Sequence, residues 1–106
     1  MNVCAIVGEI VEHPQLRGKE TKALVFVVET RQPSNNGDQK EQTTRIPAVM
    51  FNPDESLAEQ LVKNGKGMLV MFQGRVQGTP FEVSGGGTRY NGEVVVYNRS
   101  FATAKR

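Results

Sequence analysis

Few side chains in this sequence could carry out catalysis. The 106 residues include one histidine, His13, and one cysteine, Cys4. A zinc site of the usual kind takes four protein or solvent ligands, and one imidazole with one thiol does not supply them. A serine or cysteine nucleophile needs a base beside it, and His13 precedes Pro14 at the expected end of a strand. We therefore expect no enzyme activity, no metal and no cofactor.

Three acidic residues, Asp54, Glu55 and Glu59, lie close together in the sequence. They fall in the one segment whose apolar residues have helical spacing. There the positive end of the helix dipole and a solvent-exposed face account for them. Apart from this group, eight of the 11 acidic residues remain against 13 lysines and arginines. The net charge is only +2, but this distribution permits a basic groove.

Cations and aromatic rings offer a second kind of chemistry. Arg45 and Phe51 are six residues apart on one expected strand, so both side chains project from the same face. Phe81 falls in a glycine-rich reversal, residues 78–87, with little around it to pack against. Rings that stack on bases and cations that meet phosphates hold a single nucleic-acid strand. The candidate contact residues are Arg17, Lys19, Lys22, Arg31, Arg45, Phe51, Arg75, Phe81, Arg89 and Tyr90.

Each aromatic candidate also has a structural interpretation. Phe51 could pack in the core or in a subunit interface, and Phe81 could pack across its own hairpin. Tyr90 could belong to an interface, and we assign Tyr97 to packing.

The elements that position these residues are mainly strands. Apolar alternation and turn signals predict strands at residues 1–12, 23–31, 43–51, 67–77 and 88–101. The first strand is apolar on both faces, which predicts burial on both sides and a homodimer or homotetramer.

One helix is expected between the third and fourth strands. Asn52 can cap it, Pro53 suits its first position, and Gly65 can end it in a left-handed conformation. Three strands, a helix and two strands are the order of a five-stranded OB barrel, an all-β fold with one helix. We expect a single OB-fold domain over residues 1–101 and a short basic C-terminal end over residues 102–106.

Several short motifs, in order and at near-family spacing, resemble the bacterial single-stranded DNA-binding protein family. The match runs from Asn2 to about Tyr97. The motifs are Val7-Gly8 with Pro14 and Leu16-Arg17, then Lys40-Glu41-Gln42-Thr43 before Phe51, Leu57-Ala58-Glu59 with Gly65 and Gly67, Gly74-Arg75-Val76, and Arg89-Tyr90 with Glu93-Val94-Val95-Val96.

The resemblance implies a cytosolic protein that coats exposed single strands as a dimer or tetramer. Phe51 matches a family phenylalanine that stacks on bases, and Phe81 matches a family tryptophan with the same role. The chain departs from the family at Arg45, where a tryptophan is common, and no aromatic residue lies near Gln32. The acidic recruitment tail of the family is absent, so recruitment of replication proteins is in doubt.

The expected function is sequence-tolerant binding of single-stranded DNA in replication, recombination, repair or mobile-element transfer, with RNA left open. One alternative is a primosomal accessory OB protein that docks a replication partner. The other is a protein-binding OB domain without DNA activity. No apolar run approaches the ~20 residues of a membrane span, and the lone Cys4 suits a reducing compartment. We therefore expect a cytoplasmic protein without a membrane partner.

Overall fold

The computed structural model describes residues 2–33 and 41–104. Within these ranges, only the backbone is described at residues 32–33, 41, 79–83, 88–91 and 104. The elements are β1 (Cys4–Ile10), β2 (Gln15–Arg17), β3 (Ala23–Pro33), β4 (Glu41–Phe51), α1 (Glu55–Asn64), β5 (Leu69–Val83), β6 (Gly87–Val96), the 3-10 helix η1 (Asn98–Ser100) and β7 (Ala102–Ala104).

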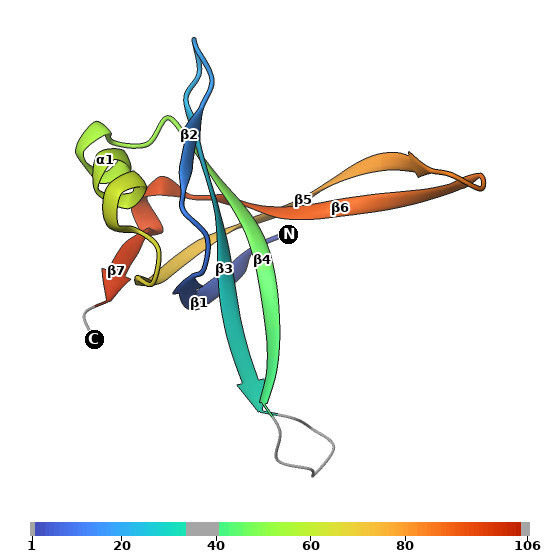
Figure 1. Ribbon diagram of the computed structural model, residues 1–106, viewed down its shortest axis with the longest axis horizontal. Coiled ribbons are helices and arrows are strands. Elements are labelled where there is room, and N and C mark those ends of the chain that lie inside the picture. The colour runs from blue at the N-terminus through green and yellow to red at the C-terminus, as the bar shows by residue number, and fades with distance from the viewer. Residues whose placement is uncertain (1, 34–40, 105–106) are drawn as a thin grey trace.

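Five of the strands close into a barrel. Their order is β1-β3-β4-β6-β5, and the barrel closes where β5 pairs with β1, for example Ile6 with Phe72. The β4–β6 pairing is parallel, whereas the other pairings are antiparallel. Two hairpins, β3–β4 and β5–β6, extend beyond the barrel in different directions (Figure 1). The predicted five-stranded OB barrel is therefore confirmed.

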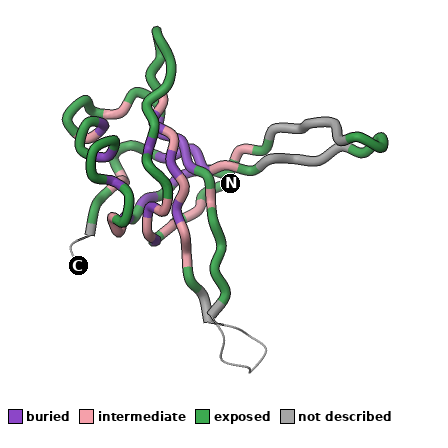
Figure 2. Tube along the Cα trace, viewed as in Figure 1, coloured by how far each residue is buried: buried purple, intermediate pink, exposed green. Residues whose placement is uncertain are grey.

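Alternate residues of each barrel strand fill the core. The largest fully buried side chains are Phe26, Ile10, Leu24, Met50, Leu61, Val28 and Val70. Phe26 meets Phe72 and Phe101 edge-on at centroid distances of 5.8 and 6.0 Å, a favoured geometry for aromatic pairs. The buried segments gather where the strands cross, and the tip of the β5–β6 hairpin, residues 84–87, is exposed (Figure 2).

The helix lies where the sequence predicts it, but its caps differ. Asp54, not Asn52, is the N-cap: its carboxylate accepts a hydrogen bond from the backbone N–H of Leu57. The Ser56 hydroxyl and this N–H lower the pKa of Asp54, so its carboxylate stays ionised at a lower pH than that of an ordinary aspartate. Asn52 instead turns the chain out of β4 with a φ of 49°.

Gly65 is also not the left-handed residue, because its φ is −70°. The left-handed conformation falls on Gly67, with a φ of 90°. The helix is ten residues long, and no helix of the described ranges is long and apolar enough to cross a membrane.

Three strand predictions are wrong in extent. The first strand runs only from Cys4 to Ile10, within the predicted range 1–12, and an unpredicted short strand, β2, pairs with β3 after Pro14. The expected reversal at residues 78–87 is short, because β5 and β6 pair as far as Val83 and Gly87. Phe81 therefore lies in the ladder opposite Arg89, not in a loop.

The last predicted strand, residues 88–101, ends early at Val96. The Ser100 hydroxyl hydrogen-bonds the carbonyl of Tyr97 at 2.6 Å, which stabilises the turn η1, and Phe101 packs on the core. The chain then returns as β7 beside β5, with Leu69 opposite Ala104. The expected short end after residue 101 is thus partly a strand.

Two glycines permit close approach of the strands that close the barrel. A Cβ on Gly8 would lie 2.5 Å from the carbonyl oxygen of Glu29, and a Cβ on Gly74 would collide with the carbonyl oxygen of Val95. Any side chain at either position would push neighbouring strands apart.

Gly74→Ala should therefore lower the free energy of unfolding by about 1–3 kcal/mol, the usual cost of overpacking a tight site. Gly92→Ala is the matched control, because a Cβ there meets nothing within 4 Å. Its effect should stay within about 0.5 kcal/mol. Urea denaturation of both variants measures the difference, and equal stabilities would contradict the close-approach argument.

Candidate nucleic-acid interface

The side chains that do not face the core form an outer face on β2, β3, β4 and β6. One row of this face contains Arg17, Ala23 and Phe51. Arg17 is the cross-strand partner of Ala23, and Ala23 is the partner of Phe51. Partners across neighbouring strands point to the same side and lie about 5 Å apart. The Cα atoms of Arg17 and Phe51 are therefore about 10 Å apart along this row.

A second row consists of valines. Val25 is the partner of Val49, and Val49 is the parallel partner of Val95. Arg75 continues the row on β5 as the partner of Val95. Although they point outward, Val49 and Val95 are only 5% and 6% exposed. This apolar row lies beside the Phe51 row and ends in a cation.

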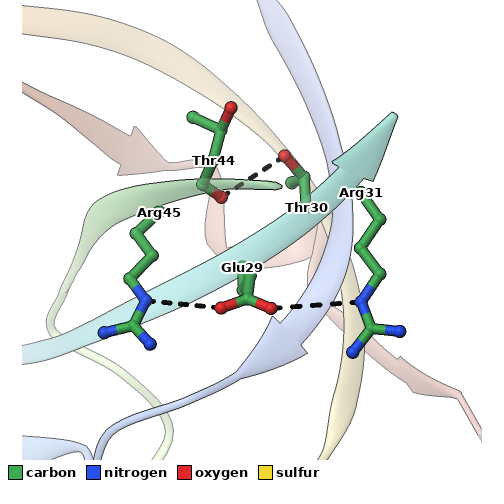
Figure 3. A network of polar contacts seen from close by, with 5 residues as sticks. All are labelled: Glu29, Thr30, Arg31, Thr44 and Arg45. Carbon is green, nitrogen blue, oxygen red and sulfur yellow. Dashed lines mark hydrogen bonds and ion pairs between the residues drawn. The ribbon is translucent and has the colours of Figure 1, made fainter. Parts of the chain in front are cut away.

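A third part of the outer face carries charge. Glu29 and Arg45 are partners on β3 and β4, and Arg31 follows on β3. The Glu29 carboxylate lies between the two guanidinium groups, 3.3 Å from Nε of Arg45 and 3.9 Å from Nε of Arg31 (Figure 3). Beside them, the Thr30 hydroxyl donates to the carbonyl of Thr44.

The exposure of these three side chains determines how much their ion pairs contribute to stability. The arginine side chains are 64% and 66% exposed and the Glu29 side chain 19%. Ion pairs this exposed add little stability, so their main effect is on where the cations sit. Glu29 also lies opposite Glu9 across β1 and β3. Like charges directly opposite are destabilising, and the two arginines offset that repulsion at Glu29.

Phe51 is held through its backbone and exposed through its ring. The side-chain amide of Asn98 donates hydrogen bonds to the carbonyls of Phe51 at 2.8 Å and of Asn52 at 3.3 Å. The N–H of Asn52 donates to the carbonyl of Lys22 at 2.8 Å. The Phe51 residue is 42% exposed. These bonds fix the end of β4 and leave the ring accessible.

The other predicted residues lie around these rows. Arg17 donates to the amide oxygen of Gln15 at 2.9 Å, and Arg75 donates to that of Gln77 at 3.4 Å. Lys19 and Lys22 are exposed in the turn between β2 and β3.

Three candidates lie on the β5–β6 hairpin. Phe81 and Arg89 are backbone partners, and Tyr90 is the partner of Pro80. Their side chains lie outside the described residues, so the structure places their strands only.

Sequence reasoning missed Glu29 and Asn98. Each acts across strands: Glu29 reaches Arg45, and Asn98 reaches the end of β4. No local spacing marks either residue, because the contacts depend on cross-strand register.

A closed five-stranded barrel with a helix between its third and fourth barrel strands, and an outer face of cations and an exposed ring, defines an OB-fold protein. The sequence profile of the single-strand binding protein family matches residues 1–102, so this chain belongs to that family.

The fold also resembles solved structures. Plasmodium falciparum SSB in complex with ssDNA superimposes with a TM-score of 0.72 at 17% sequence identity. The match covers 97% of this chain and 92% of that chain. At this identity, the likeness concerns the fold. A search of the curated proteins finds no match.

Proposed function

We propose that this protein binds single-stranded DNA without regard to sequence, along the outer face of β2, β3 and β4. The observation that carries the proposal is the shared face of Arg17, Arg31, Arg45 and Phe51, joined to membership of the single-strand binding protein family. The guanidinium groups meet phosphates, and the exposed Phe51 ring stacks on a base. Every base has a flat face, so stacking of this kind tolerates any sequence.

The spacing of Arg45 and Phe51 along β4 sets the direction in which the DNA strand runs. Arg45 and Phe51 are six residues apart, or about 20 Å at the rise of a β-strand. One DNA strand reaches both only if it runs along β4. Lys19 and Lys22 extend the basic surface past Phe51, and Arg75 extends it onto β5. Phe81, Arg89 and Tyr90, whose side chains lie outside the described residues, are further proposed contacts on the β5–β6 hairpin.

We place this binding in the cytoplasm, in DNA replication, recombination or repair, with no catalytic step. The protein covers the strand and leaves its bonds intact. The P. falciparum SSB, with the same fold, was solved with ssDNA, which supports single-stranded DNA as the ligand.

We also propose that the chain self-associates through β1. Val7 and Met71 are cross-strand partners that are 58% and 44% exposed, and Val3, just before β1, is 52% exposed. The sequence predicts burial on both sides of β1, yet this side is open in the single chain. A dimer or larger assembly would cover it.

The DNA proposal predicts that labelled oligo-dT binds far more tightly than duplex of equal length and that binding weakens as salt rises. Phe51→Ala should weaken oligo-dT binding by on the order of tenfold, the effect of losing one stacked base. Fluorescence anisotropy at two salt concentrations measures both effects.

Val62→Ala is the control for Phe51→Ala, because Val62 is 41% exposed on α1 and carries neither a ring nor a charge. Its affinity should match that of the wild type. Equal affinities for all three proteins would remove Phe51 from the interface, and equal binding of duplex would contradict single-strand preference.

Glu29→Gln should strengthen oligo-dT binding several-fold at low salt. The substitution removes the carboxylate that lies between Arg31 and Arg45 and frees both cations for phosphates. The plot of log affinity against log salt should become steeper by about 0.7 for each arginine released. Glu59→Gln on α1 changes the net charge equally and should have a smaller effect. Weaker binding by Glu29→Gln would mean that Glu29 is needed to position the arginines.

Val7→Glu should lower the molar mass measured by light scattering, because it places a charge on the exposed apolar side of β1. Val62→Glu is the matched control on α1 and should leave the mass unchanged. A wild-type protein with the mass of a single chain would contradict self-association.

A further inference from the structure

We propose that Tyr97 is a second base-stacking residue, which forms with Phe51 a two-ring platform on the outer face. The inference rests on the proposed DNA path across that face and names a contact residue that the sequence assigns to packing.

The parallel register of β4 and β6 places the two rings together. Ala48 is the partner of Val94 and Val49 the partner of Val95, so the same offset brings Phe51 beside Tyr97. The hydrogen bond from the Asn98 side chain to the carbonyl of Phe51, at 2.8 Å, shows that the strands remain adjacent at this point. Neighbouring strands are about 5 Å apart.

The two residues also point to the same side. Val94 and Val96 belong to the core, so Val95 and Tyr97 point outward along the extended chain. Tyr97 itself has an extended backbone, with φ −80° and ψ 108°. On β4, Met50 belongs to the core and Phe51 points outward.

Exposure separates these rings from the valines beside them. Phe51 is 42% exposed and Tyr97 41%, whereas Val49 and Val95 in the preceding row are 5% and 6% exposed. A large aromatic residue that only packs would be expected to share the burial of its neighbours. Both rings instead offer surface to a ligand.

The backbone of Tyr97 is fixed on both sides, so binding does not have to order the segment that carries the ring. Its N–H donates to the carbonyl of Gln73 at 2.9 Å, and its carbonyl accepts from the Ser100 hydroxyl at 2.6 Å. Asn98, the next residue, is tied to Phe51 and Asn52. A prepositioned ring loses less conformational entropy on binding than a mobile one.

The charges around the platform suit a polyanion. The row that holds Phe51 continues from Arg17 and Ala23 through Tyr97 to Gln73, and it contains no acid. Glu93 is four residues before Tyr97, about 13 Å along the strand. The row itself therefore offers a phosphate the Arg17 cation and no carboxylate.

The sequence supplies a direct test, because the chain has two tyrosines, Tyr90 and Tyr97, and no tryptophan. In Tyr90→Phe, all tyrosine emission comes from Tyr97. Titration with oligo-dT should quench this emission with the same midpoint as the anisotropy of labelled oligo-dT. The double variant Tyr90→Phe/Tyr97→Phe gives the background signal, and N-acetyltyrosinamide titrated with the same oligo-dT corrects for absorption by the DNA.

Affinity provides the second measurement. Tyr97→Ala should weaken oligo-dT binding by on the order of tenfold, and Tyr97→Phe, which keeps the ring, should bind as the wild type does. Val62→Ala is again the exposed control on α1. Thermal melting shows whether Tyr97→Ala is folded, and the quenching measurement stands whether or not that variant folds.

The outcomes separate this inference from the proposed function. Saturable anisotropy with unchanged Tyr97 emission overturns the inference and leaves DNA binding intact. A smaller molar mass of Tyr97→Ala, with emission insensitive to DNA, places the ring in a subunit interface and also overturns it. No anisotropy change with oligo-dT at low salt refutes the proposed function, and the inference with it.

Discussion

The close approach of strands at Gly8 and Gly74 is the constraint on which the rest of the structure depends. Gly8 faces the backbone of Glu29, and Gly74 faces the backbone of Val95. Gly8 thus lets β1 approach β3, and Gly74 lets β5 approach β6. Between them, β1 and β5 pair with each other and close the barrel. Closure gives every strand an inner and an outer side. The same period of two that buries Phe26 and Met50 therefore sends their neighbours along the chain to one continuous outer face.

The sequence predicted the order of elements because apolar alternation and turn residues are local signals. Details that depend on tertiary contacts were wrong. Asn52 is a residue type that often caps helices. Here its backbone N–H donates to Lys22 and its carbonyl accepts from Asn98, and Asp54 caps the helix instead. The return of the chain as β7 could not be predicted, because it depends on packing of Phe101 against Phe26 and Phe72.

The candidate site divides in the same way. Arg45 and Phe51 share one strand, so their common face followed from spacing alone, and the structure exposes both. Glu29 reaches Arg45 across an antiparallel pair, and Asn98 reaches the carbonyl of Phe51 from the segment that follows β6. Register between strands is set by the closed barrel and not by any segment of sequence. A site that combines residues from several strands is therefore only partly visible in the sequence.

The pairing of β1 with β5 has a consequence for how the chain folds. One edge of β1 pairs with β3, but on the other edge Cys4 pairs with Gly74, so that edge finds its partner only after 70 further residues have been made. At a synthesis rate of roughly 5–20 residues per second, that takes several seconds. Meanwhile the β3–β4 hairpin, whose strands are close in sequence, can form early, because local pairings form faster than distant ones. During this interval the unpaired edge of β1 is open to other nascent chains, which makes chaperone protection most valuable before β5 emerges.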